Sequence, residues 1–207
     1  MAERSLLKQL EFDWAARAVR LADEAPAFLA SGRPPVPATP LALYAQLENV
    51  LVSFRALREL PLAELATRYA NARWTVKDLL GHLATWAAEF RREMETVTRG
   101  ESFDYAIPFA LSILGPNEWN NRQAEAQRAV PLETLLDAFE ADTRWMQDLV
   151  LALPEAALHG PVRLPLAPSG DPQALFHGSI AMLVLGKCQH DAYHIGRLAA
   201  LFERWSR

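Results

Sequence analysis

Residues 74–86, WTVKDLLGHLATW, contain the clearest helix start in the chain. Thr75 can cap a helix here, and Asp78, three residues later, completes a capping box. Beyond this start, apolar residues recur every three or four positions to about residue 98, where a glycine follows. This spacing predicts a long helix with one apolar side, and it places His82 at the edge of that side.

The same periodicity predicts the other main elements of the chain. Further helices are expected at about residues 41–60, 117–128, 131–153 and 173–205. The stretch 154–172 holds five prolines and two glycines, so it is predicted to be loop. The only strand candidate is 161–166. Four long helices with intervening loops define an all-α fold, a four-helix bundle.

The N-terminal part of the chain is predicted to be an appendage. Residues 4–24 have the apolar spacing of a one-sided helix, and 31–40, SGRPPVPATP, contain four prolines. We therefore divide the chain into an N-terminal helix with a proline-rich linker, residues 1–40, and a helical bundle, residues 41–207. The alternative is that the extra N-terminal helix packs tightly on the bundle.

Composition excludes several classes of protein. The chain has 51% hydrophobic and 22% charged residues, as soluble globular proteins do. Its net charge of −4 argues against a nucleic-acid partner, and no apolar stretch is long enough to cross a membrane. The N-terminus lacks the apolar core of a signal peptide, and the single cysteine cannot form an internal disulfide. We therefore expect a cytoplasmic protein with neither a nucleic-acid nor a membrane partner.

Two of the five histidines have the spacing of metal ligands. His190 and His194 lie four apart on the last predicted helix, so both rings project from one face and can converge on one ion. Spacing alone is equally consistent with two surface or hydrogen-bonded histidines. On a helical wheel, however, Leu183 and Leu201 lie within about 40° of His190, which places the pair beside apolar side chains. Gly186, one turn earlier, leaves space for a ligand or another helix.

His82 is the third candidate ligand. It lies where two helices are expected to meet, with Trp86 on the same side. Taken alone, His82 is better explained as a hydrogen-bonded histidine at the edge of the core. The remaining histidines, His159 and His177, show no comparable pattern and are left out of the site.

The two histidine-containing motifs, in this order and at this separation, resemble those of a known family. WTVKDLLGHLATW, followed about a hundred residues later by HDAYHIGRL at 190–198, resembles the DinB-like superfamily, including its YfiT-type and mycothiol-dependent maleylpyruvate isomerase N-terminal branches. The resemblance covers about residues 41–205. It implies a four-helix bundle in which His82, His190 and His194 are metal ligands, and it implies homodimers.

Three imidazoles would leave a coordination position open to water or substrate. Imidazole ligands suit several divalent transition metals, of which zinc and nickel are the leading choices here. The resemblance implies a metal-dependent hydrolase or a thiol-dependent transferase or isomerase, acting on a small molecule with a low-molecular-weight thiol as possible co-substrate. The alternative is a non-catalytic helical bundle stabilised by its metal, or a ligand-binding stress protein.

Other residues near the histidines are open to two interpretations. Glu89 and Glu93 are candidates for a general base, although acidic residues on helices are usually only solvated. Lys187 and Arg197 could bind an anionic substrate, with surface snorkelling as the commoner alternative. The last helix is also apolar on several sides. Its residues away from His190 are therefore candidates for a subunit contact: Ala181, Leu185, Cys188 and Ala199.

Overall fold

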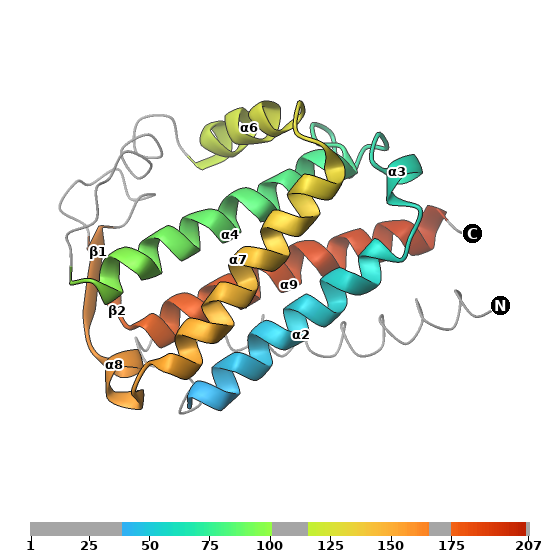
Figure 1. Ribbon diagram of the computed structural model, residues 1–207. Helices are drawn as coiled ribbons and strands as arrows, with labels where there is room; N and C mark the ends of the chain where they lie inside the picture. Colours follow the sequence, from blue (N-terminus) through green and yellow to red (C-terminus); the bar gives the residue numbers. More distant parts are fainter. Residues whose placement is uncertain (1–38, 101–115, 166–174, 206–207) are drawn as a thin grey trace.

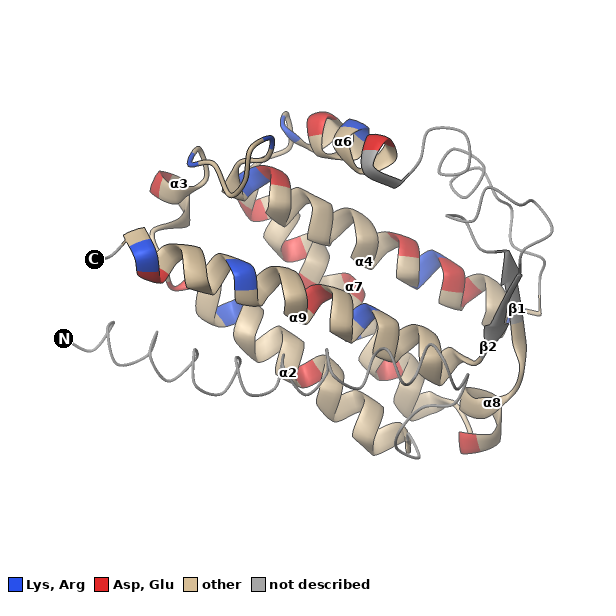
Figure 2. Cartoon of the chain, turned by 180° about the vertical axis from the view of Figure 1, so that it is seen from behind, with Lys and Arg blue, Asp and Glu red and all other residues tan. Residues whose placement is uncertain are grey.

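Four long helices form the bundle within the described residues, which are 39–100, 116–165 and 175–205 of the computed structural model (Figure 1). They are α2 (Pro40–Arg58), α4 (Val76–Thr98), α7 (Leu132–Ala152) and α9 (Ile180–Trp205). Each packs against two of the others, in the order α2, α7, α4, α9 and back to α2. Seen from behind, α9 runs between α2 and α4 (Figure 2). The predicted all-α fold is confirmed, while the predicted N-terminal helix lies outside the described residues.

The start of α4 has the predicted capping box. The Thr75 hydroxyl accepts a hydrogen bond from the Asp78 amide at 3.1 Å, and the Asp78 carboxylate accepts one from the Thr75 amide at 2.9 Å. Asp78 also pairs with Arg128, just beyond α6 (Pro116–Gln127), with an Nε–Oδ1 distance of 2.9 Å. At Gly81, a Cβ would lie only 2.9 Å from the Cβ of Gln127, so a glycine is needed for α6 to approach α4.

Residues 154–178 contain a short helix and two short strands, so the predicted loop at 154–172 and the predicted helix start at about 173 are wrong in part. β1 (Val162–Pro165) pairs antiparallel with β2 (Leu175–Gly178), and α8 (Glu155–His159) precedes them. The strand candidate at 161–166 is thus confirmed, but the stretch 154–172 is not all loop. The last helix begins at Ile180 instead of about 173, because the preceding residues pair with β1. Ser179 begins it, with its hydroxyl accepting the Met182 amide at 3.3 Å.

The core lies between the four long helices. Its largest fully buried side chains include Phe54 of α2 and Phe139 of α7, whose ring centroids lie 4.1 Å apart. Ala181 and Cys188 of α9 are also buried in this core. The chain itself therefore covers two of the four residues expected at a subunit contact, and only Leu185 and Ala199 remain partly exposed.

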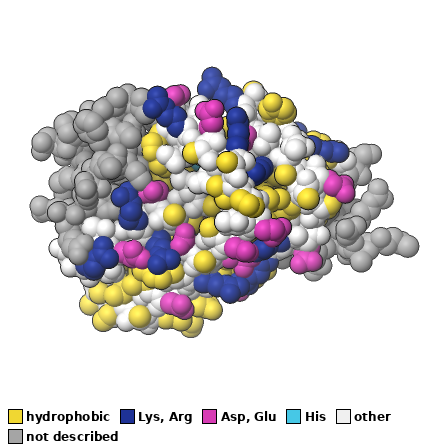
Figure 3. Space-filling model, turned by 45° about the horizontal axis from the view of Figure 1, so that its top comes forward, with side chains coloured by type: hydrophobic (Ala, Val, Ile, Leu, Met, Phe, Trp, Pro, Cys, Tyr) yellow, Lys and Arg dark blue, Asp and Glu magenta, His cyan; other side chains and the backbone are white. Residues whose placement is uncertain are grey.

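The surface carries charges of both signs. On the face in Figure 3, acidic and basic side chains lie close together. Ion pairs link neighbouring helices: Arg58 of α2 contacts Glu140 of α7 at 2.9 Å, and Arg91 of α4 contacts Asp142 of α7 at 3.0 Å. None of the helices in the described ranges is long and apolar enough to cross a membrane.

Candidate metal centre

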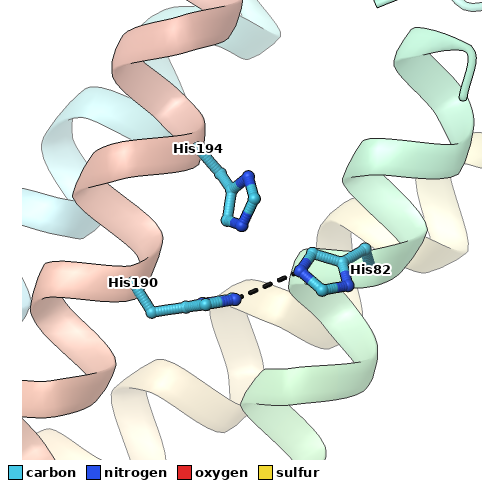
Figure 4. Close-up of side chains that lie close together, drawn as sticks. All are labelled: His82, His190 and His194. Atoms are coloured by element: carbon cyan, nitrogen blue, oxygen red, sulfur yellow. Dashed lines mark hydrogen bonds between the residues drawn. The ribbon is translucent and has the colours of Figure 1, made fainter. Parts of the chain in front are cut away.

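Three histidines from two helices converge on one point between α4 and α9 (Figure 4). His82 comes from α4, and His190 and His194 come from α9, one helical turn apart. One ring nitrogen of each lies within 4.8 Å of the other two. The structure therefore brings together the same three histidines that the sequence singled out. His159 lies on α8 and His177 on β2, and neither belongs to this cluster.

His82 is the most enclosed of the three. Its side chain is 4% exposed, and its Nε2 lies 3.1 Å from Nε2 of His190. The packing of α4 against α9 places it opposite the histidine pair. His82 is thus a hydrogen-bonded histidine of the core, as its position predicts, and its partner is the second member of the cluster.

The tautomer of His190 follows from its other ring nitrogen. Nδ1 of His190 lies 3.0 Å from Oδ1 of Asp191. Burial raises the pKa of the Asp191 carboxyl, but the Lys187 ammonium and the hydrogen bond from His190 outweigh this and hold the pKa below its usual range. Because an ionised carboxylate only accepts hydrogen bonds, His190 Nδ1 carries the proton and donates it. The His190 ring is thereby oriented with its Nε2 toward the cluster, 3.1 Å from Nε2 of His82.

Lys187 lies in the core and is bonded to Asp191. The sequence suggested that it either binds an anionic substrate or snorkels at the surface, and both interpretations are wrong. Its side chain is 0% exposed, so it neither snorkels nor reaches a substrate. Its ammonium donates to Oδ2 of Asp191 and to the Thr143 hydroxyl of α7, the latter at 3.0 Å. The ammonium also lies 4.8 Å from the ring centroid of Phe139. Sequence alone could not show this, because the partners of Lys187 on α7 are more than 40 residues away.

The protonation state suits metal binding. Burial, followed by the proximity of His190 and His194, lowers the pKa of His82 to about 2. Burial, followed by the proximity of His190, lowers the pKa of His194 to about 3. Both imidazoles are therefore neutral near pH 7, which is the form that binds a metal.

The spacing of the nitrogens provides a test of the fit. In a tetrahedral site with metal–nitrogen distances of about 2.0–2.1 Å, two ligand nitrogens lie about 3.3 Å apart. The 3.1 Å separation of His82 and His190 is already close to this value. The widest separation in the cluster is within 4.8 Å and would have to shorten by up to about 1.5 Å, which side-chain rotation can supply. The three residues thus fit an imidazole-bound metal ion.

Aromatic side chains border the cluster on the α4 side. The Trp74 ring centroid lies 4.9 Å from that of His82, and the Trp86 centroid lies 5.8 Å from that of His190. Both indole N–H groups donate to asparagines of α6: Trp74 to Asn121 at 2.9 Å and Trp86 to Asn120 at 3.1 Å. Helix α6 thereby orients both indoles. This contribution could not be predicted from the sequence, since nothing in the short polar stretch of α6 indicates it.

Tyr193 and Arg197 lie beside His194. The Tyr193 ring centroid is 5.1 Å from that of His194, and the ring is exposed. Arg197 donates to the Tyr193 hydroxyl at 2.9 Å and is also exposed. This places an exposed guanidinium near the cluster, one helical turn from His194 on the side away from His190.

The two acidic candidates do not reach the histidines. Glu89 and Glu93 follow His82 by two and three helical turns, or about 10 and 16 Å along the helix axis. Glu89 pairs with Arg92 at 2.7 Å and lines a separate cavity of about 350 Å³ between α4, α6 and α7. Burial, followed by the charge of Glu89, raises the pKa of Glu93 to about 7. Neither carboxylate therefore belongs to the cluster of His82, His190 and His194.

The family is established by comparison with known proteins. The model of the DinB superfamily matches residues 44–198, which include all three clustered histidines. The chain therefore belongs to the DinB superfamily. No curated protein and no solved structure matches it.

Proposed function

We propose that this protein binds one divalent transition-metal ion, zinc or nickel, on His82, His190 and His194, and uses it to act on a small molecule. The observation that carries the proposal is the convergence of three imidazoles from two helices within 4.8 Å. The low pKa values of His82 and His194 support it, because neither ring is a cation near neutral pH. Membership of the DinB superfamily is compatible with such a site.

Three residues next to the histidines support the proposed metal site. Asp191 holds His190 with its Nε2 toward the cluster. Trp74 and Trp86 exclude water from the α4 side, where their rings cover His82 and His190. Three protein ligands leave room for water or substrate, and a bound divalent ion supplies a Lewis acid that polarises a carbonyl or lowers the pKa of bound water. We assign no catalytic role to Glu89.

An enzyme is favoured over a bundle held together by metal because the apolar core is already extensive. The core cluster spans all four long helices, so the fold does not depend on a metal clamp between α4 and α9. A chelator should accordingly lower the melting temperature only moderately and leave the helical circular-dichroism signal intact. Outright unfolding on metal removal would instead favour the non-catalytic, metal-stabilised alternative.

Metal analysis of the purified protein tests the site directly. We expect close to one transition-metal ion per chain by elemental analysis, since one cluster of three histidines is present in the described residues. His190→Ala combined with His194→Ala should remove nearly all of it. The matched control is His159→Ala, an exposed histidine on α8, which should keep the full metal content. Full occupancy in the double variant would show that the metal binds elsewhere.

Two finer parts of the proposal come from the resemblance. The reaction is that of a hydrolase or of a thiol-dependent transferase or isomerase, and a change in the absorption spectrum of cobalt-substituted protein on adding a small thiol would favour the second. The protein is also proposed to be a homodimer. Since Ala181 and Cys188 are buried within the chain, a dimer would have to use other surfaces, and light scattering at micromolar concentration tests it.

A further inference from the structure

The least expected feature of the core is a fully buried ion pair next to the cluster. Lys187 and Asp191, one turn apart on α9, are both 0% exposed and bonded to each other. Each donor or acceptor of the pair has its own partner. Oδ2 of Asp191 accepts from Lys187, and Oδ1 accepts from His190. The ammonium of Lys187 is shared between Asp191, the Thr143 hydroxyl and the face of the Phe139 ring.

Thr143 anchors the pair to α7. Its hydroxyl donates to the backbone carbonyl of Phe139 at 2.8 Å, which leaves the oxygen lone pairs free to accept from Lys187. A continuous chain of hydrogen bonds therefore runs from α7 through Lys187 and Asp191 to His190. The direction of each hydrogen bond follows from the groups involved. The Lys187 ammonium can only donate, and the Phe139 carbonyl and the Asp191 carboxylate can only accept.

Stability alone does not account for the pair. Removing two charges from water costs several kcal/mol per ion, and replacing a buried pair with apolar residues of similar volume is often neutral or stabilising. The helices around it already share a large apolar core. What the pair does supply is an oriented acceptor for Nδ1 of His190, at 3.0 Å.

We propose that Asp191 and Lys187 are positioning residues of the metal centre: Asp191 holds His190 in the tautomer whose Nε2 lone pair points at His82 and His194, and Lys187 holds Asp191 in place. The inference rests on the proposed metal site for its purpose. The tautomer of His190, however, is a property of the metal-free protein and can be measured without any metal. Outer partners of this kind typically contribute 10- to 100-fold to metal affinity.

Three variants of the full chain separate positioning from structural support. Lys187→Met combined with Asp191→Leu replaces the pair by apolar residues. Asp191→Asn keeps the shape but lets the amide donate to Nδ1 of His190, which favours the wrong tautomer. Cys188→Ala is the matched control, because Cys188 is buried on the same helix and has no contact in this chain of hydrogen bonds.

Three measurements are made on each variant. They are the His190 tautomer from long-range proton–nitrogen NMR spectra of the metal-free protein, the Zn²⁺ affinity from competition with a chromophoric chelator, and the melting temperature without metal. In the wild type, we expect the proton on Nδ1 of His190. The double variant should melt at an equal or higher temperature, show a mixture of tautomers, and bind Zn²⁺ 10- to 100-fold more weakly. Asp191→Asn should lose affinity to a similar extent. Cys188→Ala should lower only the melting temperature.

Several results would overturn the inference. One is a wild-type His190 protonated on Nε2 in the metal-free protein. Another is a folded double variant, or a folded Asp191→Asn protein, that binds Zn²⁺ as tightly as the wild type. A third is a Cys188→Ala protein with the same loss of affinity, because that loss would then reflect general loosening of α9. If the wild type binds neither Zn²⁺ nor Ni²⁺, the proposed function fails, and the tautomer measurement still decides the positioning of His190.

Discussion

Acid should destabilise the metal-free protein through two of its clustered histidines. Burial and the proximity of the other imidazoles lower the pKa of His82 to about 2 and that of His194 to about 3, from the ordinary histidine value of 6.5. Below pH 6.5 the unfolded chain therefore takes up protons that the folded protein does not. Stability that is fully present above pH 6.5 is lost as the pH falls toward 3. At pH 5 the loss is about 2 kcal/mol for each histidine, or about 4 kcal/mol together.

Glu93 acts in the opposite direction over part of the same range. Burial and the charge of Glu89 raise the pKa of Glu93 from 4.5 to about 7. The folded protein therefore takes up this proton before the unfolded chain does, and stability is gained as the pH falls from 7 toward 4.5. Between pH 8 and pH 5 the gain is about 2.5 kcal/mol. The wild type should thus lose only about 1.5 kcal/mol, the difference between the two effects.

Urea unfolding separates the contributions of the two histidines and of Glu93 to stability. It is measured in the presence of a chelator, at several pH values from about 8 to 5. Between pH 8 and pH 5, the Glu93→Gln protein should lose the full amount of about 4 kcal/mol in unfolding free energy. The double variant Glu93→Gln with His82→Gln should lose only about 2 kcal/mol. His159→Gln, on exposed α8, is the control and should leave the wild-type dependence unchanged. A Glu93→Gln protein that loses less than about 1 kcal/mol over this range would refute the reasoning. So would a His82→Gln substitution that does not reduce the loss.

Two further predictions concern how α6 is held on α4. Gly81→Ala places a Cβ 2.9 Å from the Cβ of Gln127 and should lower the free energy of unfolding by about 1–2 kcal/mol, whereas Gly196→Ala, with no atom within 4 Å, should raise it by about 0.5–1 kcal/mol. Equal effects at the two positions would contradict the close approach of α6. Asp78→Ala removes the carboxylate half of the capping box and the ion pair with Arg128, and it should lower the free energy of unfolding by about 2–3 kcal/mol. A loss below about 0.5 kcal/mol in urea unfolding would show that neither interaction contributes.

Comparison of sequence and structure shows which features depend on local interactions. The start of α4 was predictable because Thr75 and Asp78 satisfy each other's backbone groups within four residues. The pairing of His190 with His194 on one face was predictable for the same reason, since helical geometry places residues four apart one above the other. The resemblance to the DinB superfamily, confirmed over residues 44–198, added His82 as their partner.

Three features were decided by the tertiary structure. The last helix begins later than predicted because β2 pairs with β1, which lies ten residues or more before it in the chain. Glu89 and Glu93 share a side of α4 with His82, but neither belongs to the cluster, and Glu89 pairs with Arg92 instead. Lys187 carries the same charge and the same long side chain as any surface lysine, yet its surroundings place it at 0% exposure.

The physical reason is the same in each case. By itself the sequence determined that the chain forms four long helices, where α4 begins, and that two histidines share a face, because these depend on contacts within a turn or two of one helix. Only the packing of α4, α7 and α9 against one another brings His82 within 3.1 Å of His190 and joins Lys187 to Thr143. Those contacts join residues 108 and 44 positions apart, and their formation depends on the burial of the whole core.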